Sequence, residues 1–217
     1  GFDPYAAAAS LREDPDVLAA SPDVALTLHV VPNDPWYPLQ WHLGTSAAAV
    51  RAPAAWDRST GSASVVIAIL DTGVDLTHAD LAYKIWRNTG EVPLNGLDDD
   101  GNGWVDDVNG WDFGDLDPDP NPDPIQDAVT GVDVGWHGTF VAGLAAASTN
   151  NGTGVAGVAW GCRVMPLKVT DVDGTIWLDA IVAGFDYALA GGAKVLNVSM
   201  GTTDPAAADF FQVLADE

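Results

Sequence analysis

Residues 65–73 read Val-Val-Ile-Ala-Ile-Leu-Asp-Thr-Gly, an unbroken apolar run that stops at Asp71. A run of this length, rich in β-branched residues and closed by Thr-Gly, predicts a strand that is buried on both faces. Such strands belong to parallel sheets, in which ligands and reacting groups gather beyond the carboxyl ends of the strands. Asp71 therefore stands where a catalytic or ligand-binding carboxylate is expected, although the same residue would also suit a simple cap of the following turn.

Length and composition describe a chain that folds around one core. It has 217 residues, of which 47% are hydrophobic, enough for one sizeable core without requiring two. No apolar run reaches the length that spans a membrane, and Gly1 does not open a signal peptide. We therefore expect that a leader was removed or that the chain was cut from a longer one. Cys162 is the only cysteine, which excludes an intrachain disulfide.

The charge balance is strongly acidic. Eight Lys and Arg residues face 31 Asp and Glu residues, a formal net charge of −23. This charge makes nucleic acid and anionic membrane surfaces poor partners. The excess of acids indicates either cation binding or a solvating surface suited to high salt. Many of the acids fall between Asp98 and Asp133, which favours cation binding for at least some of them.

Strand and helix patterns alternate from residue 65 onward. Strands are predicted over 163–169 and 194–199, and helices over 137–147, 178–189 and 205–216. This alternation predicts an α/β fold with a doubly wound, mostly parallel sheet and helices on both faces, incomplete at the carboxyl end because no strand follows the last helix. Weaker patterns earlier in the chain predict a helix over 6–12, a strand over 24–31, a helix over 47–50 capped by Thr45 or Ser46, and a helical turn over 52–56.

An acidic loop follows the first buried strand. Its spacing resembles the first half of an EF-hand loop, in which alternate oxygen ligands and a glycine at the sharp turn suit calcium. The twelfth position holds Asn109 instead of glutamate, so we expect a calcium loop of another kind, and a solvated acidic turn is the alternative. The candidate ligands are Asp98, Asp100, Asn102, Trp104 and Asp106.

His137 opens a predicted helix of small residues. The positive end of the helix dipole disfavours an extra proton at this position, which suits a neutral imidazole that acts as a general base. A capping histidine without chemistry is the alternative.

Three short motifs in this order carry a resemblance to a known family. They are Asp-Thr-Gly at 71–73, His-Gly-Thr-Phe-Val-Ala-Gly at 137–143 and Asn-Val-Ser-Met-Gly at 197–201. Each motif is weak alone, but together, on a predicted strand end, helix start and strand end, they resemble the subtilisin-like serine proteases. The resemblance covers about residues 36–217. It implies a secreted, calcium-dependent serine endopeptidase that is made as a zymogen and cleaves protein or peptide substrates.

The resemblance also implies roles for individual residues. Asp71 would orient the histidine and stabilise its protonated form, and His137 would be the general base and acid. Two segments would pair with an extended substrate, namely Ser199, Met200 and Gly201 on one side and Asp173, Gly174 and Thr175 on the other. Besides the acidic loop, a second calcium site would comprise the side chains of Gln40, Asp80 and Asn151 and the carbonyls of Thr153 and Val155.

The same resemblance divides the chain. Residues 1–32 would be the tail of a propeptide that inhibits its own protease, residues 33–39 a linker with the maturation cut, and residues 40–217 the amino-terminal portion of the catalytic domain. The family's serine and oxyanion asparagine lie in a later stretch, so we expect the 217 residues to be inactive alone. Ser46, in Gly44-Thr45-Ser46, imitates the nucleophile motif, but it precedes Asp71 and is interpreted as a helix cap.

Two other classes of protein compete with this interpretation. One is a catalytically dead module that binds calcium and peptides. The other is a nucleotide-binding α/β protein, which is disfavoured because no glycine-rich loop with the required spacing follows Asp71.

Overall fold

A computed structural model describes residues 3–22, 31–127 and 130–201. The chain divides into two compact units, residues 1–30 and 31–217. In the first unit, helix α1 (Pro4–Leu11) begins after Asp3, whose carboxylate accepts hydrogen bonds from the amides of the first turn. Apart from Val31, the predicted strand over 24–31 lies outside the described residues, as does the predicted helix over 205–216.

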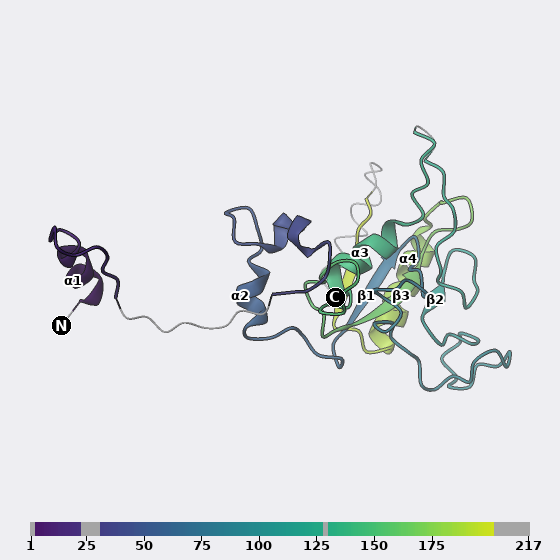
Figure 1. The fold of residues 1–217 in the computed structure, drawn as a ribbon. Helices are drawn as coiled ribbons and strands as arrows, with labels where there is room; N and C mark the ends of the chain where they lie inside the picture. Colours follow the sequence, from purple (N-terminus) through teal and green to yellow (C-terminus); the bar gives the residue numbers. More distant parts are fainter. Residues whose placement is uncertain (1–2, 23–30, 128–129, 202–217) are drawn as a thin grey trace. The chain divides into compact units, whose positions relative to one another are not determined.

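In its described residues, the second unit has a parallel sheet of four strands in the order β2-β3-β1-β4. Figure 1 labels β1, β3 and β2 of this sheet. Strand β1 (Val66–Asp71) pairs with β3 (Arg163–Lys168) on one side and with β4 (Val195–Val198) on the other. Strand β2 (Trp111–Asp112) pairs with the carboxyl end of β3. Because these four strands pair in parallel, their carboxyl ends meet at one edge, as the predicted α/β fold requires.

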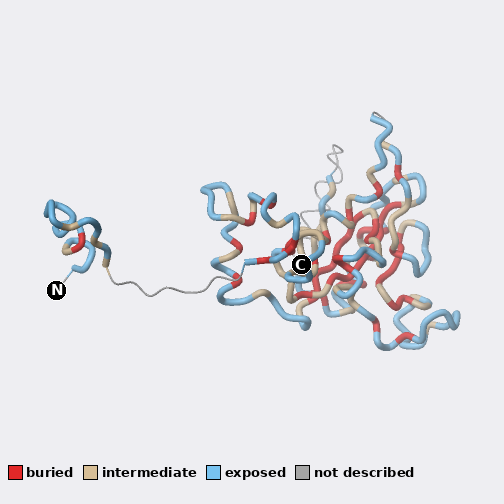
Figure 2. The backbone as a smooth tube through the Cα atoms, in the orientation of Figure 1, coloured by how far each residue is buried: buried red, intermediate tan, exposed pale blue. Residues whose placement is uncertain are grey.

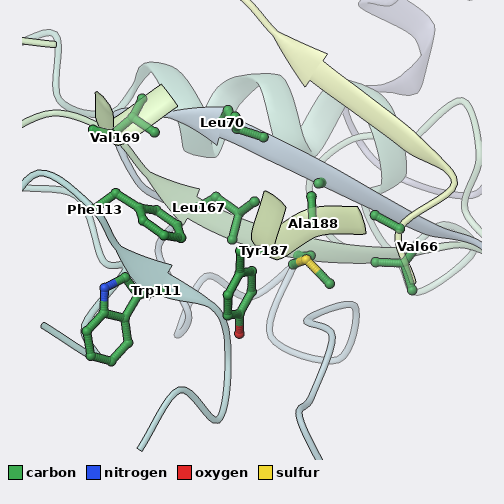
Figure 3. Close-up of a cluster of buried hydrophobic side chains, with 12 residues drawn as sticks. Val66, Leu70, Trp111, Phe113, Leu167, Val169, Tyr187 and Ala188 are labelled. Carbon is green, nitrogen blue, oxygen red and sulfur yellow. The ribbon is translucent and has the colours of Figure 1, made fainter. Parts of the chain in front are cut away.

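Helices cover both faces of this sheet. Ala68 and Leu70 of β1 pack in a cluster with α4 (Leu178–Ala190), which Figure 3 shows in close-up. Ile67 and Ile69, which alternate with them, pack on the other face with α3 (His137–Ala146). All six residues of β1 are buried, which explains an apolar run without alternation. Figure 2 shows buried segments in the region of these strands. Complete burial of each large apolar side chain stabilises the folded state by about 1.5–3 kcal/mol.

One prediction about the segments before β1, the helix over 47–50, is corrected. Residues 46–49 form a turn and not a helix, because the amide of Val50 donates to the carbonyl oxygen of His42 and folds the chain back. Ser46 therefore caps no helix in the structure. Helix α2 (Ala52–Trp56) is present as predicted, and its Trp56 stacks on Trp160 with ring centroids 4.7 Å apart.

The segment over 33–39, for which the resemblance implies a linker, has a defined local structure. It contains the short 3-10 helix η1 (Tyr37–Leu39), which is followed by η2 (Trp41–Leu43). Asp34 is 2% exposed, and its carboxylate accepts a 2.9 Å hydrogen bond from the amide of Asn150. A buried carboxylate is stable only when hydrogen-bond donors surround it, so this contact fixes the segment in place.

Among the described residues, no helix is long and apolar enough to cross a lipid bilayer.

Candidate active site

The carboxyl end of β1 meets the first turn of α3. The Oδ1 atom of Asp71 lies 2.7 Å from Nδ1 of His137 and also accepts a 2.8 Å hydrogen bond from the amide of Thr72. Asp71 is 3% exposed, whereas the His137 side chain is 41% exposed. The contact assigns the proton of the neutral imidazole to Nδ1, so that Nε2 carries the free electron pair. The pair therefore joins a buried carboxylate to a partly exposed imidazole.

Small residues allow this close approach. A Cβ atom on Gly138 would lie 2.3 Å from the carbonyl oxygen of Gly73 and 2.9 Å from Cβ of Asp71. Gly73 itself has a φ of +102°, which side-chain-bearing residues rarely adopt. Thr72 joins the two elements, because its Oγ1 donates to the carbonyl of Gly135 at 2.6 Å and accepts from the amide of Gly138 at 3.0 Å. The glycines and Thr72 thus hold His137 against Asp71.

The predicted substrate segments leave the sheet on opposite sides of β1. Asp173, Gly174 and Thr175 follow β3, and Ser199, Met200 and Gly201 follow β4. The first segment is a tight loop in which Asp171 accepts hydrogen bonds from the Thr175 amide and the Trp177 indole, and these two bonds lower the pKa of Asp171. The strand order therefore leaves the end of β1, with Asp71, between the two segments.

The residues of the second predicted calcium site lie together. The Asp80 carboxylate is 1% exposed and accepts hydrogen bonds from the Asn151 side chain and the Val155 amide, both at 2.8 Å. Gln40 makes a two-way contact with the backbone of Ala156, next to Val155. Thr153 belongs to the same loop, and its amide donates to Oδ1 of Asn151 at 2.9 Å. The loop over 150–156 thus surrounds the Asp80 carboxylate with N–H donors.

In the acidic loop, one group of carboxylates is close enough to share a cation. Glu91, Asp100 and Asp107 each bring an oxygen atom within 4.8 Å of the others. Of these three, only Asp100 is among the ligands predicted from the sequence. Asp107 is fully buried, and its Oδ2 accepts a 2.6 Å hydrogen bond from the hydroxyl of Tyr187. Burial and Asp107 together raise the pKa of Tyr187.

The other predicted ligands of this loop mainly shape its backbone. Asp98 accepts hydrogen bonds from the amides of Gly101 and Gly103, and Asp106 accepts them from the amides at 95 and 96. Asn102 donates from its side chain to Asp107 at 2.9 Å, and Trp104 packs with the aromatic core. Glu91 and Asp107 flank the spaced motif, so the motif does not mark them as ligands. Only the folded loop brings these two buried carboxylates close to Asp100.

A further charged cluster was not anticipated. The buried Lys168, at the end of β3, contacts the carboxylates of Asp112, Asp115 and Asp123. One signal in the sequence marks it, namely a lysine that closes an otherwise apolar strand pattern.

These features define a class: α/β proteins in which a buried aspartate orients a histidine at the carboxyl edge of a parallel sheet, as the acid–base pair of a serine hydrolase requires. Residues 62–215 match the family model described as the subtilase family, peptidase S8. The chain belongs to this family.

Individual relatives agree with this assignment. An extracellular protease of Xanthomonas campestris pv. campestris is 36% identical over 200 residues, which cover 88% of this chain and 33% of that protein. Thermitase of Thermoactinomyces vulgaris is 36% identical over 172 residues, 79% of this chain and 48% of that protein. A solved protease structure from Pseudoalteromonas arctica superimposes with a TM-score of 0.61 at 30% identity, covering 85% of this chain and 56% of the other. The chain spans only a third to a half of the length of the two curated relatives.

Proposed function

We propose that the protein acts as a serine endopeptidase in which Asp71 and His137 form the acid–base pair. The observation that carries this proposal is the 2.7 Å contact between Nδ1 of His137 and Oδ1 of Asp71 at the end of a buried strand. With Nδ1–H directed to Asp71, Nε2 is free to accept the proton of a nucleophile. The carboxylate then stabilises the imidazolium until the proton passes to the leaving amine.

In this proposal the nucleophile is a serine outside the 217 residues, accompanied by an asparagine that binds the oxyanion. Within the described part of the chain, Asp71 is the hydrogen-bond partner of the His137 ring. Ser46 lies instead in a turn that the amide of Ala49 closes on its carbonyl oxygen. A base that activates no hydroxyl gives no useful rate of hydrolysis, so the 217 residues alone are proposed to be inactive.

The proposed substrate is an extended segment of a protein or peptide. It would add as a strand between residues 173–175 and 199–201, because extended peptides bind through backbone hydrogen bonds to such edges. The position of both segments beyond the strands that flank β1 supports this placement. It would bring the scissile bond over Asp71 and His137.

Calcium is the proposed cofactor of two sites. Calcium prefers six to eight oxygen ligands, and carboxylates are among the ligands that it binds. Glu91, Asp100 and Asp107 fit a divalent cation, because their oxygen atoms lie within 4.8 Å of one another and Asp107 has no exposure to water. Asp80, with the loop over 150–156, is the second site. The ions would fix both loops and take no part in the proton transfers.

The proposal extends to maturation and location. We propose that residues 1–32 are the tail of an inhibitory propeptide, that residues 33–39 form the maturation region and that the protein is secreted. The division of the chain at Val30 supports a boundary there. Relatives that are named extracellular proteases support secretion.

Hydrolysis by the gene product that carries this chain tests the proposed function. We expect cleavage of casein that a serine-directed fluorophosphonate abolishes and that His137→Ala lowers by about 10⁴-fold or more. His42→Ala is the control, because its ring contacts only Trp41 among the described aromatic residues. Peptide binding without any hydrolysis would instead favour a catalytically dead module.

A further inference from the structure

Lys168 is a charged residue in a fully buried position. Its side chain is 0% exposed, at the last position of β3. The sheet register places it opposite Asp71 of β1 and opposite Asp112 of β2. An isolated buried ammonium costs several kcal/mol, so this position requires close compensation by opposite charge.

Three carboxylates from separate points in the chain supply that compensation. The Nζ atom of Lys168 lies 2.5 Å from Asp112, 2.8 Å from Asp115 and 2.8 Å from Asp123. Oxygen atoms of these three residues come within 4.8 Å of one another, a spacing that would suit a metal ion. Burial by itself would lower the pKa of Lys168, but the hydrogen bonds to the three carboxylates outweigh burial and raise it. The ammonium therefore stays charged.

We propose that the Lys168 ammonium is a built-in cation that occupies the cage of Asp112, Asp115 and Asp123 in place of a metal ion, and that it thereby positions the Asp71–His137 pair. A divalent ion in the same cage would lie within about 5 Å of the ammonium and be repelled by it. The three carboxylates can therefore hold either the Lys168 ammonium or a metal ion, but not both. The positioning role rests on the proposed function, whereas the occupancy of the cage does not.

The cage connects to both members of the pair through the segment over 112–124. Behind Asp71, the amide of Val74 donates to the carbonyl of Pro120 at 2.9 Å, and the amide of Leu76 donates to Asn121 at 3.0 Å. On the histidine side, a Cβ atom on Gly135 would lie 1.9 Å from the carbonyl oxygen of Asp123. A shift of Asp123 would therefore disturb the backbone that follows Asp71 and the backbone that precedes His137.

Removing the ammonium tests the proposal without any measurement of hydrolysis. Calcium bound per chain is counted by equilibrium dialysis for the wild-type protein and for Lys168→Ala. The control is Lys194→Ala, which makes the same charge change at an exposed lysine just before β4. We expect Lys168→Ala to bind one more calcium ion than the wild type and the control, because the emptied cage accepts a metal. An equal count in all three proteins would overturn the proposal.

Two further measurements distinguish an effect of Lys168 on the position of His137 from an effect on the stability of the fold alone. The low-field NMR signal of the His137 Nδ1 proton reports the hydrogen bond to Asp71. In Lys168→Ala we expect this signal to be lost without calcium and restored by calcium, and a signal that persists in the calcium-free variant would refute the positioning role. If Lys168→Ala does not fold, Lys168→Met combined with Asp112→Asn should fold without added calcium, because the double change removes a pair of opposite charges. If the double variant folds no better than Lys168→Ala, the result would also contradict the proposed pairing of Lys168 with these carboxylates.

Discussion

The Nδ1 atom of His137 lies 2.7 Å from Oδ1 of Asp71, although 66 residues separate the two in the sequence. The contact depends on a helix that begins directly over the end of a buried parallel strand. Gly138 permits the approach, and Thr72 ties the backbone on both sides of His137 to β1. The geometry of the pair is therefore a property of the backbone packing as much as of the two side chains.

Gly138→Ala should disrupt the pair without removing either member. The added Cβ would lie 2.3 Å from the carbonyl oxygen of Gly73, so α3 must move away from β1. A displacement of about 1 Å at a reacting group lowers the rate by about 10²-fold. We expect a loss of that size in kcat/KM for a peptide substrate, measured on the gene product that carries this chain. Gly143→Ala on the same helix is the matched control, because its added Cβ meets no atom within 4 Å. Equal losses in the two variants would contradict this explanation.

Asp71→Asn should abolish most of the activity while leaving the fold intact. The amide cannot stabilise the imidazolium, and it favours the wrong tautomer of His137, which in serine proteases lowers kcat by about 10⁴-fold. Steady-state kinetics measures the loss, and the circular dichroism spectrum should match that of the wild type. A variant that kept a tenth of the wild-type kcat would show that Asp71 serves only as a cap.

Removal of calcium should destabilise the protein through the acidic loop. Chelation should lower the unfolding temperature, since an ion at about 100 times its dissociation constant contributes about 2.7 kcal/mol to stability. Asp107→Asn should reduce the calcium bound per chain by one, because Asp107 is a buried member of the group with Glu91 and Asp100. Asp16→Asn, an exposed acid in the first unit, is the control and should leave the count unchanged.

Stability should fall in alkaline solution because of Tyr187. Burial and the hydrogen bond to Asp107 raise the pKa of Tyr187 above its ordinary value of 10.0. The unfolded chain therefore loses this proton at a lower pH than the folded chain, so the stabilising contribution is complete below about pH 10 and decreases above it. Urea unfolding at several pH values should show a shallower alkaline decline for Tyr187→Phe. Tyr83→Phe, at an 84% exposed position, should decline as the wild type does.

The sequence predicted the elements with strong patterns. The strand ending at Asp71, the helices starting at His137 and Leu178 and the strand over 163–168 are present, because long apolar runs and small-residue helices have few alternative structures. Strand β2 has only two residues, and it forms by pairing with the edge of β3. The local sequence pattern around Trp111 does not predict this pairing. The turn over 46–49 likewise depends on a backbone bond to His42.

The contact between Asp71 and His137 was predictable from the sequence motifs, but the residues around it were not. Asp71 and His137 stand out by their positions at a strand end and a helix start. Glu91 and Asp107 join Asp100 only after the acidic loop folds, and Lys168 meets its three carboxylates only across β2 and the segment that follows it. Charged residues that meet only in the folded chain have no fixed spacing in the sequence, so a sequence motif cannot identify them.

Labelling with a fluorophosphonate tests most directly whether Asp71 and His137 activate a serine. The gene product that carries this chain is treated with the reagent, and the modified peptide is identified by mass spectrometry in the wild type, in His137→Ala and in His42→Ala. We expect one labelled serine in the wild type and in His42→Ala and no labelling in His137→Ala. Equal labelling in all three proteins, or none in the wild type, would contradict the proposed acid–base pair.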